Sequence, residues 1–285
     1  MAGSAVITSI NNPPPTGDAV QTFYSNATVA NLIAAGTDVN WYDAAIGGNL
    51  LSPTTILVHG NTYYASQTIE GCESQNRLAV LVIIVLNKTI NLHLFLEGLF
   101  DDVSKMMVEA KDGLTGEPKW AYGVADRIQV DLFGENYPYA PTGVSIGGID
   151  LSTAGLATFQ VSSVWSGNYY IRVRSRNHLE TWSAIPVPFS SSTIDYYFNT
   201  SMLQAYGTNP QAQVSTNPPL YAFFLGDLEQ GGWVDADDFN IFEPFLTTGI
   251  TGFVNSDFNG SGWVDSDDFN LLEPRLTMGV ASQHL

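Results

Sequence analysis

The end of the chain holds acidic and amide side chains at regular intervals that could bind a metal ion. Residues 232–249 align with residues 262–279 at an offset of thirty, and thirteen of the eighteen aligned positions are identical. A repeat of this length is one supersecondary unit, so the two copies are expected to stack. Residues 221–285 contain eleven Asp and Glu and a single base, Arg275, so a cation is expected to balance them.

The second copy has the complete donor pattern of a calcium loop. Calcium is a hard cation that takes about six to eight oxygens, and a twelve-residue loop supplies them from positions 1, 3, 5, 7, 9 and 12, position 7 by its carbonyl. Gly262 falls at the sixth position, where the chain turns sharply. The expected ligands are Asp257, Asn259, Ser261, the Trp263 carbonyl, Asp265 and Asp268.

The first copy offers a second, less complete calcium loop. Its expected ligands are Asp227, Glu229, Gly231, the Trp233 carbonyl, Asp235 and Asp238. Gly231 has no side-chain oxygen and Glu229 is longer than the usual Asp or Asn, so water must fill one vertex or the affinity falls. The alternative is a pair of acidic, solvated turns without metal, although carboxylates crowded around one turn repel one another.

The repeats resemble dockerin repeats more than full EF-hands. Each loop ends in Asp rather than Glu, a short helix-prone run follows at residues 269–272, and residues 251–256 read as extended where an EF-hand has its entering helix. The resemblance implies a small helical module at residues 221–285 that docks onto a cohesin-like domain. Pro244 and Pro274 are expected to end each helix after about two turns.

Large apolar side chains accompany the loops. Their helical spacing after each loop predicts that they form a core within the module. The alternative is an exposed apolar surface that binds a partner. The residues concerned are Phe239, Phe242, Phe245, Phe269, Trp233 and Trp263.

The first part of the chain, residues 1–87, reads as a small antiparallel β-sandwich. Short alternating runs at residues 40–42, 62–66 and 77–86 are separated by turn-forming Asn, Gly and Pro. Trp41 is expected in the core. The sole cysteine, Cys72, excludes an internal disulfide and is expected to be a buried small residue.

This part resembles the immunoglobulin-like modules of Bacteroidota surface proteins. The resemblance is carried by Ala-Thr-Val-Ala-Asn-Leu at residues 27–32, Thr-Tyr-Tyr-Ala-Ser-Gln at 62–67 and Gly-Cys-Glu-Ser at 71–74. In that family a second cysteine near the position of Tyr24 would pair with the one matching Cys72. This sequence lacks it, so the cross-link that the family implies is missing.

Residues 88–203 read as a second β-sandwich. Strands of period two are expected at residues 90–96, 127–132, 169–174 and 194–198. Runs at residues 123–126 and 176–183 resemble the domain that precedes the terminal repeat in the same surface proteins. Residues 204–220, rich in Gln, Asn, Pro and Thr, are expected to be a linker.

The predicted fold class is therefore mainly β: two antiparallel β-sandwich (immunoglobulin-like) domains followed by a small dockerin-like α module with two calcium loops. The 285 residues include 10 basic and 28 acidic side chains, and the formal charge of -18 argues against nucleic acid and anionic lipid as partners. The longest apolar run, residues 78–86, is too short to insert across a bilayer. No signal peptide opens the chain, so either a leader has been removed or the sequence belongs to a longer protein.

No catalytic machinery is expected. The four histidines, His59, His93, His178 and His284, are scattered without a zinc-binding spacing. The best acid/base cluster is His178 with Glu180 near Trp182, but on a strand these alternate residues merely share one face. The sequence therefore predicts a protein that is not an enzyme.

The leading functional hypothesis is a noncatalytic, extracellular or cell-surface structural or adhesive protein. Calcium would stabilise it, and it would assemble with copies of itself into a surface fibre or filament. One alternative is a dockerin-type appendage that anchors a larger secreted enzyme through a cohesin-like domain. The other is a carbohydrate-binding protein that uses exposed aromatic residues to contact a glycan: Trp120, Tyr122, Tyr137 and Tyr139.

Overall fold

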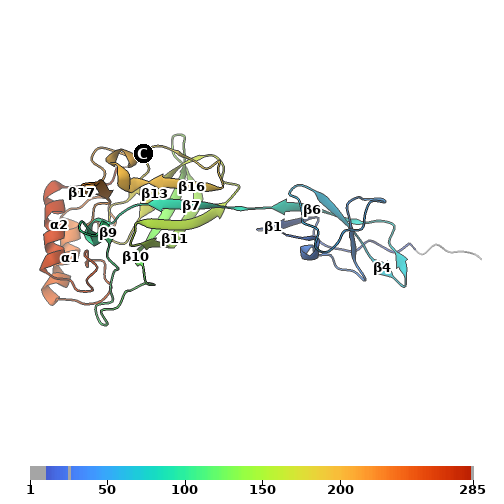
Figure 1. Ribbon diagram of the computed structural model, residues 1–285, viewed down its shortest axis with the longest axis horizontal. Helices are drawn as coiled ribbons and strands as arrows, with labels where there is room; N and C mark the ends of the chain where they lie inside the picture. The colour runs from blue at the N-terminus through green and yellow to red at the C-terminus, as the bar shows by residue number, and fades with distance from the viewer. Residues whose placement is uncertain (1–10, 25–26, 284–285) are drawn as a thin grey trace, which may run out of the picture. The chain divides into compact units, whose positions relative to one another are not determined.

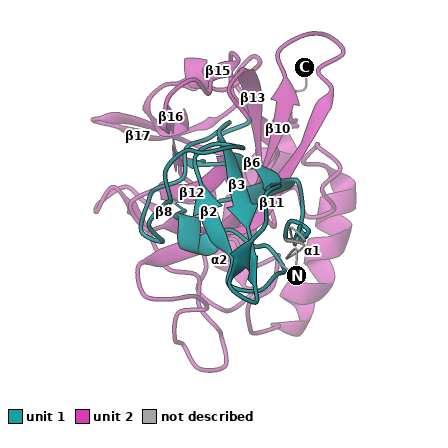
Figure 2. Ribbon diagram, turned by 90° about the vertical axis from the view of Figure 1, so that its right-hand side faces the viewer, with its two compact units in different colours: residues 1–87, 162–164 teal, residues 88–161, 165–285 magenta. Residues whose placement is uncertain are grey.

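A computed structural model of the chain describes residues 11–24 and 27–283 (Figure 1). Within these residues the chain forms two compact units, which Figure 2 shows in teal and magenta. Unit 1 comprises residues 1–87 with 162–164, and unit 2 comprises residues 88–161 with 165–285. Residues 1–10 of the first predicted domain lie outside the described part, as do residues 284–285 of the last, including His284.

Unit 1 is built on a mixed sheet with the strand order β1-β6-β3-β2. Its strands are β1 (Val20–Phe23), β6 (Leu78–Ile84), β3 (Thr62–Ser66) and β2 (Asn40–Tyr42). The first two pair in parallel, whereas the other pairs are antiparallel. The expectation of a purely antiparallel sheet is corrected here. A parallel pair needs a long crossover, and residues 24–77 supply one that contains the rest of the unit.

The core of unit 1 is formed by side chains on one face of its strands, where buried and less buried residues alternate along the chain. Trp41 is 8% exposed, and Ala65, Val80 and Val82 are fully buried. Cys72, by contrast, is exposed, which corrects the expectation of a buried residue. It lies on β5 (Cys72–Glu73), which pairs with β4 (Thr68–Ile69) in a short hairpin, and both residues of β5 are exposed. The remaining element is a 3-10 turn, η1 (Val29–Asn31).

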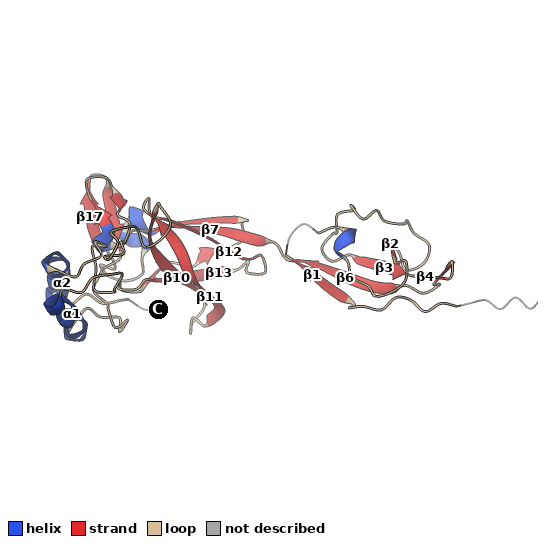
Figure 3. Cartoon of the chain, turned by 90° about the horizontal axis from the view of Figure 1, so that it is seen from below, coloured by secondary structure: helices blue, strands red, loops and turns tan. Residues whose placement is uncertain are grey.

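Unit 2 contains an eight-stranded sheet in its described residues, with the order β14-β13-β10-β11-β12-β7-β16 and β15 beside β13 (Figure 3). Because β16 pairs in parallel with β7, this sheet is also mixed rather than antiparallel. The strands predicted from period-two alternation lie in β7, β10, β13 and β16. The bounds are β7 (Asn87–His93), β10 (Val124–Gly134), β11 (Pro141–Ser152), β12 (Leu156–Ser162), β13 (Asn168–Arg174), β14 (Thr181–Trp182), β15 (Val187–Pro188) and β16 (Thr193–Tyr197).

The two ends of this sheet meet. The Ala184 amide, just after β14, donates to Tyr196 Oη on β16 at 3.1 Å and to the Gln204 carbonyl at 2.9 Å. Tyr196 Oη donates to the same carbonyl at 2.6 Å, and burial raises the pKa of Tyr196 to about 12. The sheet therefore folds over on itself and encloses one core, to which strands from both ends contribute.

The expected linker at residues 204–220 is instead structured. It contains the hairpin of β17 (Ala212–Thr216) and β18 (Pro219–Ala222), in which Ala212 and Ala222 are buried. The polar residues that suggested a linker, Gln213 and Thr216, occupy exposed positions of a short amphipathic strand. The other short elements of unit 2 are η2 (Glu97–Leu99), β8 (Phe100–Asp101), β9 (Met106–Met107), η3 (Phe198–Thr200) and η4 (Met202–Gln204).

Helices α1 (Ala236–Thr248) and α2 (Ser266–Met278) follow the two loops and lie side by side (Figure 1). They belong to the same compact unit as the sheet. Both run past the proline that was expected to end them. Each stops at a glycine in the left-handed region, Gly249 at φ 59° and Gly279 at φ 58°. A proline removes one hydrogen bond, but the turn after it contributes apolar side chains to the core, such as Phe245 and Leu246.

The aromatic residues of the repeats divide between core and surface. Phe242 is fully buried, and Phe239, Phe245 and Phe269 pack around the same core. Trp233 and Trp263 are 61% and 53% exposed, so the expectation that they join the core is corrected. At these equivalent positions the backbone pairs with the segment after the other repeat's helix, at Ala281 and Thr251, and the side chains are directed to solvent.

No helix in the described part of the chain is long and apolar enough to cross a membrane.

His178 gives unit 2 a dependence on pH. The residue is 1% exposed, its Nδ1 lies 2.9 Å from Ser175 Oγ, and burial followed by the Arg176 charge lowers the pKa of His178 to about 3. An unfolded histidine has a pKa of about 6.5, so the unfolded chain binds more protons below that pH. The stabilisation from neutral His178 is therefore complete above about pH 6.5 and is lost towards pH 3, at about 1.4 kcal/mol per pH unit.

The free energy of unfolding of wild type and His178→Gln, measured by urea titration between pH 4 and 7, checks this prediction. Below pH 6 the wild-type curve should be steeper by about 1.4 kcal/mol per pH unit. Equal slopes would mean that His178 is protonated in the folded state.

Candidate metal centre

The second loop holds its first and last carboxylates in fixed orientations. The Ser261 and Gly262 amides donate to the two oxygens of Asp257, at 3.0 and 2.8 Å. The Phe258 amide donates to Asp268 Oδ1 at 2.7 Å, and the Asp265 amide donates to Oδ2 at 3.1 Å. Asp257 and Asp268 are fully buried. The loop thus turns two carboxylates inward, each with backbone N–H groups behind it.

The first loop repeats this arrangement. Asp227 accepts from the Gly231 and Gly232 amides at 2.9 and 3.2 Å, and Asp238 accepts from the Leu228 amide at 2.6 Å and the Asp235 amide at 3.0 Å. The sixth-position glycines also agree in conformation, with φ 85° and 84°. The aspartates at position 9 cap their helices, and those at position 12 complete the capping boxes. The sequence repeat is therefore a structural repeat.

Each loop pairs with the segment that follows the other helix. The Val234 amide donates to the Val280 carbonyl at 2.9 Å, and the Val264 amide donates to the Ile250 carbonyl at 3.0 Å. The two repeats are therefore hydrogen-bonded to each other, and the contact between Val234 and Val280 joins the first loop to the segment after α2.

Burial disfavours the charged form of these carboxylates. Burial, with the neighbouring Asp238 charge second, raises the pKa of Asp227 to about 6. Burial likewise raises the pKa of Asp268 to about 6, and the Asp257 charge adds to this effect. The pKa of Asp238 is also raised by burial. A cation between such groups would favour their charged forms, and an all-oxygen donor set fits a hard cation such as calcium.

Asp237 is a residue of the first loop that the sequence analysis did not select. Carboxylate oxygens of Glu229, Asp235 and Asp237 lie within 4.8 Å of one another, all on exposed residues, and this is the metal-compatible group found in the described part of the chain. The signal for Asp237 was the Asp-Asp doublet before Phe239. In the loop pattern only the second Asp of that doublet has a ligand position.

Glu229 fills the space beside Gly231. A Cβ placed on Gly231 would overlap Glu229 Oε1 and lie 3.1 Å from its Cδ. In the second loop the corresponding residues are Asn259 and Ser261, and Asn259 Oδ1 accepts from the Ser261 amide at 2.8 Å. At positions 3 and 5 the first loop therefore has a longer side chain beside a glycine, where the second loop has Asn beside Ser. The two differences compensate each other in size.

The side chains of the alternative acid/base cluster, His178 and Glu180, make structural contacts. His178 is buried against Ser175. Glu180 accepts from Trp182 Nε1 at 3.0 Å and pairs with Arg172 at 3.3 Å. The one hydroxyl that these contacts bring to His178 is that of Ser175, and both residues are buried, at 8% and 1% exposed.

Trp120, one of the aromatic residues considered for glycan binding, is half-buried. Trp120 packs edge-on against Phe253 with ring centres 5.4 Å apart, and the Arg127 guanidinium lies 4.1 Å above its ring. Tyr122 and Tyr137 are 95% and 85% exposed. Tyr137 contacts Tyr139, which is half-buried, with ring centres 5.9 Å apart.

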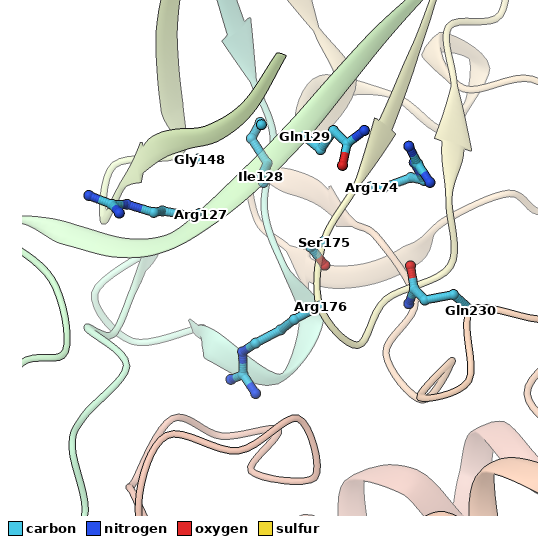
Figure 4. A pocket seen from close by; sticks show the side chains of 9 residues that line it. Arg127, Ile128, Gln129, Gly148, Arg174, Ser175, Arg176 and Gln230 are labelled. Atoms are coloured by element: carbon cyan, nitrogen blue, oxygen red, sulfur yellow. The ribbon is translucent and has the colours of Figure 1, made fainter. Parts of the chain in front are cut away.

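A cavity of about 270 Å³ in unit 2 is lined by Arg127, Arg174 and Arg176 among other residues. Figure 4 shows their side chains pointing in different directions. Each is paired with an aspartate: Arg127 with Asp150 at 2.7 Å, Arg174 with Asp131 at 3.1 Å and Arg176 with Asp126 at 2.8 Å. The cavity therefore has no convergent positive charge for an anion.

Comparisons with known proteins bear on unit 1. Residues 13–85 match the family described as Ig-like domain CHU_C associated, so this unit contains an Ig-like domain. One solved structure with similarity is a chain of an interface mutant of the type II Cohesin-X-Dockerin complex from Acetivibrio cellulolyticus. That similarity covers 68% of this chain and 97% of the other, at 11% identity and a TM-score of 0.40. No curated protein matches the chain.

Proposed function

We propose that the chain is a noncatalytic structural or adhesive part of an extracellular protein, and that calcium stabilises its second unit. The observation that carries the proposal is the duplicated loop, in which buried carboxylates with no cationic side chain on their own loop are held by backbone amides in the same way twice. The Ig-like unit 1 supports a surface or secreted location, since such domains are typical of surface proteins. Extracellular calcium suffices for sites of modest affinity.

The side chains that would hold calcium are those at positions 1, 3, 9 and 12, with Ser261 at position 5 of the second loop and the carbonyl of the tryptophan at position 7. Bound calcium supplies the positive charge that the loops lack. The chain contributes orientation, since the amides that donate to Asp257 and Asp268 fix these carboxylates before an ion arrives. Preorganisation of this kind lowers the entropic cost of binding.

The pair Glu229 and Gly231 gives a test of the first loop. Glu229→Asn alone and Gly231→Ser alone are each expected to weaken calcium binding there about tenfold. The first removes a carboxylate oxygen, and the second pushes the Glu229 side chain out of its place. The double variant recreates the donor pair of the second loop and should bind nearly as well as wild type.

A double-mutant cycle measured by calorimetry checks this expectation. The coupling between the two substitutions should be about 2–3 kcal/mol, because each tenfold loss is about 1.4 kcal/mol and the double variant recovers most of both. Additive losses would show that Glu229 and Gly231 act independently.

We also propose that copies of the chain associate through the β1 edge of unit 1. The strand at residues 78–86 cannot be the open edge, because β6 lies between β1 and β3. Beside β1 runs a groove of about 410 Å³, where Val20 is 53% and Ile33 74% exposed. The Gln21 side chain joins β1 to the backbone of Ile33, since Nε2 donates to the Ile33 carbonyl and Oε1 accepts from the Ile33 amide. An open edge with apolar flanks suits pairing with another copy.

Sedimentation of the purified chain with calcium present tests self-association. Val20→Lys should weaken association about tenfold, because a charged side chain on an edge strand disfavours pairing. Ile46→Lys is a matched control, since Ile46 is 89% exposed but lies in a loop. A strictly monomeric chain at high concentration removes the support for a fibre or filament.

A dockerin-type appendage is the second candidate function. It is favoured by Trp233 and Trp263, which are exposed at equivalent positions of the repeat and give the pair a matched apolar surface. Binding to purified cohesin-like domains, lost in Trp233→Ala with Trp263→Ala, would favour this function over self-assembly. A glycan-binding function would rest mainly on Tyr122 and Tyr137, which are 95% and 85% exposed, since Trp120 and Tyr139 are half-buried.

A further inference from the structure

We propose that Arg176, which follows strand β13, positions the second loop for calcium, so that binding at this loop depends on the sheet. This inference rests on the proposed calcium function. It makes Arg176 a positioning residue outside the repeat, with no contact to the ion itself.

Arg176 holds the start of the second loop by two backbone carbonyls. Its Nη2 donates to the Asp257 carbonyl at 2.8 Å, and its Nη1 donates to the Val254 carbonyl. Its Nε pairs with Asp126 Oδ2 at 2.8 Å, and the two side chains are 11% and 2% exposed. The guanidinium is therefore fixed from the sheet and directed at the residue that provides position 1 of the loop.

Neighbouring contacts hold the same segment. The Arg176 guanidinium lies 4.6 Å from the Phe253 ring centre, and Asn177 Nδ2 donates to the Asn255 carbonyl at 2.7 Å. The residues leading into the second loop are thus held by two consecutive residues of the bend after β13. An ordered start fixes the direction of the Asp257 side chain, which is fully buried.

The first loop supports its position-1 carbonyl from within, although the Gly226 amide just before it donates to the Asn177 carbonyl at 2.9 Å. There the position-1 carbonyl, that of Asp227, accepts from Gln230 Nε2 of the same loop at 2.7 Å. The residue equivalent to Gln230 in the second loop is Gly260, and no side chain fits at that position. A Cβ on Gly260 would lie 2.7 Å from Leu99 Cδ2 and 3.1 Å from Ala110 Cα. The second loop therefore lacks a supporting side chain where it packs on Leu99 and Ala110, and Arg176 donates to the position-1 carbonyl instead.

The positive charge of Arg176 works against a bound cation, so two effects compete. The ion pair with Asp126 offsets most of this repulsion, because the two groups are buried together at 2.8 Å. Two donated hydrogen bonds from a charged group then dominate. Removing Arg176 is expected to weaken calcium binding in the second loop about tenfold.

The experiment follows each loop separately in the intact chain. Calcium is titrated into metal-stripped protein, and the NMR signals of the Gly232 and Gly262 amides, one in each loop, report the two affinities. The variants are Arg176→Met and Arg176→Lys, the latter keeping the charge beside Asp126 in case the former fails to fold. Arg77→Met is the matched control. Arg77 also donates to two backbone carbonyls, those of Ala44 and Gly47, but lies in unit 1.

The expected result is an affinity about tenfold lower at Gly262 in Arg176→Met, a smaller loss in Arg176→Lys, and no change at Gly232 or in the control. A merely structural role would weaken both loops together, and that outcome overturns the proposal. An unchanged or tighter affinity at Gly262 also overturns it, because repulsion would then dominate. If neither glycine responds to calcium in the wild type, the proposed calcium function itself fails, which is a distinguishable result.

Discussion

Calcium added to chelator-treated protein is expected to raise the unfolding temperature of unit 2 by about 5–10 °C for each occupied loop and to leave unit 1 unchanged. A ligand that binds only the folded state adds about 2.7 kcal/mol at a hundredfold excess over Kd. For a unit of this size each kcal/mol shifts the midpoint by about 2–4 °C. The shift arises because the ion relieves the unfavourable burial of Asp227, Asp238, Asp257 and Asp268. Scanning calorimetry with and without EDTA measures it, with unit 1 as the internal control.

Variants in one loop at a time show how much of the calcium-dependent shift in unfolding temperature each loop contributes. Asp268→Ala is expected to remove more of the calcium-dependent shift than Asp238→Ala. The second loop is hydrogen-bonded to Arg176, in the bend after β13, and to Lys111, so ordering it stabilises more of unit 2. Equal shifts would contradict this inequality, and no response to chelator in the parent protein would contradict the calcium assignment.

Gly113→Ala is expected to destabilise unit 2 by about 3 kcal/mol, because the backbone of residue 113 lies directly against the second loop. A Cβ there would overlap the Gly262 carbonyl and lie 2.6 Å from the Gly252 amide nitrogen, and backbone atoms cannot rotate away as side chains do. Nearby, the Lys111 amide donates to the Gly260 carbonyl at 3.0 Å, so the two segments are also hydrogen-bonded. Urea unfolding followed by fluorescence gives the free energy.

Gly147→Ala serves as the control for this substitution. Gly147 lies in β11, and the nearest atom to an added Cβ is Gln129 Oε1 at 4.0 Å. Its stability should therefore stay within about 1 kcal/mol of the wild type. If Gly113→Ala is equally mild, the segment containing residue 113 does not pack on the second loop in solution.

Local features of the fold could be predicted from the sequence. Alternation predicted the strands now seen as β3, β10 and β13, because a half-buried strand needs apolar residues at every second position. The burial of Trp41 was predicted because large aromatic side chains usually lie in the core. The helices after the loops were predicted, but their length was wrong, since packing of the turn after Pro244 outweighs the lost hydrogen bond.

Long-range features could not be predicted in the same way. The parallel pairs β1 with β6 and β7 with β16 depend on partners far apart in the chain, and strand periodicity carries no information about pairing. The contact of Arg176 with the Asp257 carbonyl spans 81 residues and involves a backbone atom, so no residue type at the second position signals it. Glu229 was taken as a departure because the loop pattern treats each position separately, whereas its place beside Gly231 indicates a paired replacement.

The most direct test of the central claim is isothermal titration calorimetry of the metal-stripped chain with calcium. The predicted result is two calcium ions bound per chain in the wild type and one in Asp268→Ala, with magnesium failing to displace them at equal concentration because magnesium sheds its bound water reluctantly. No calcium-dependent heat in the folded wild-type chain would contradict the account.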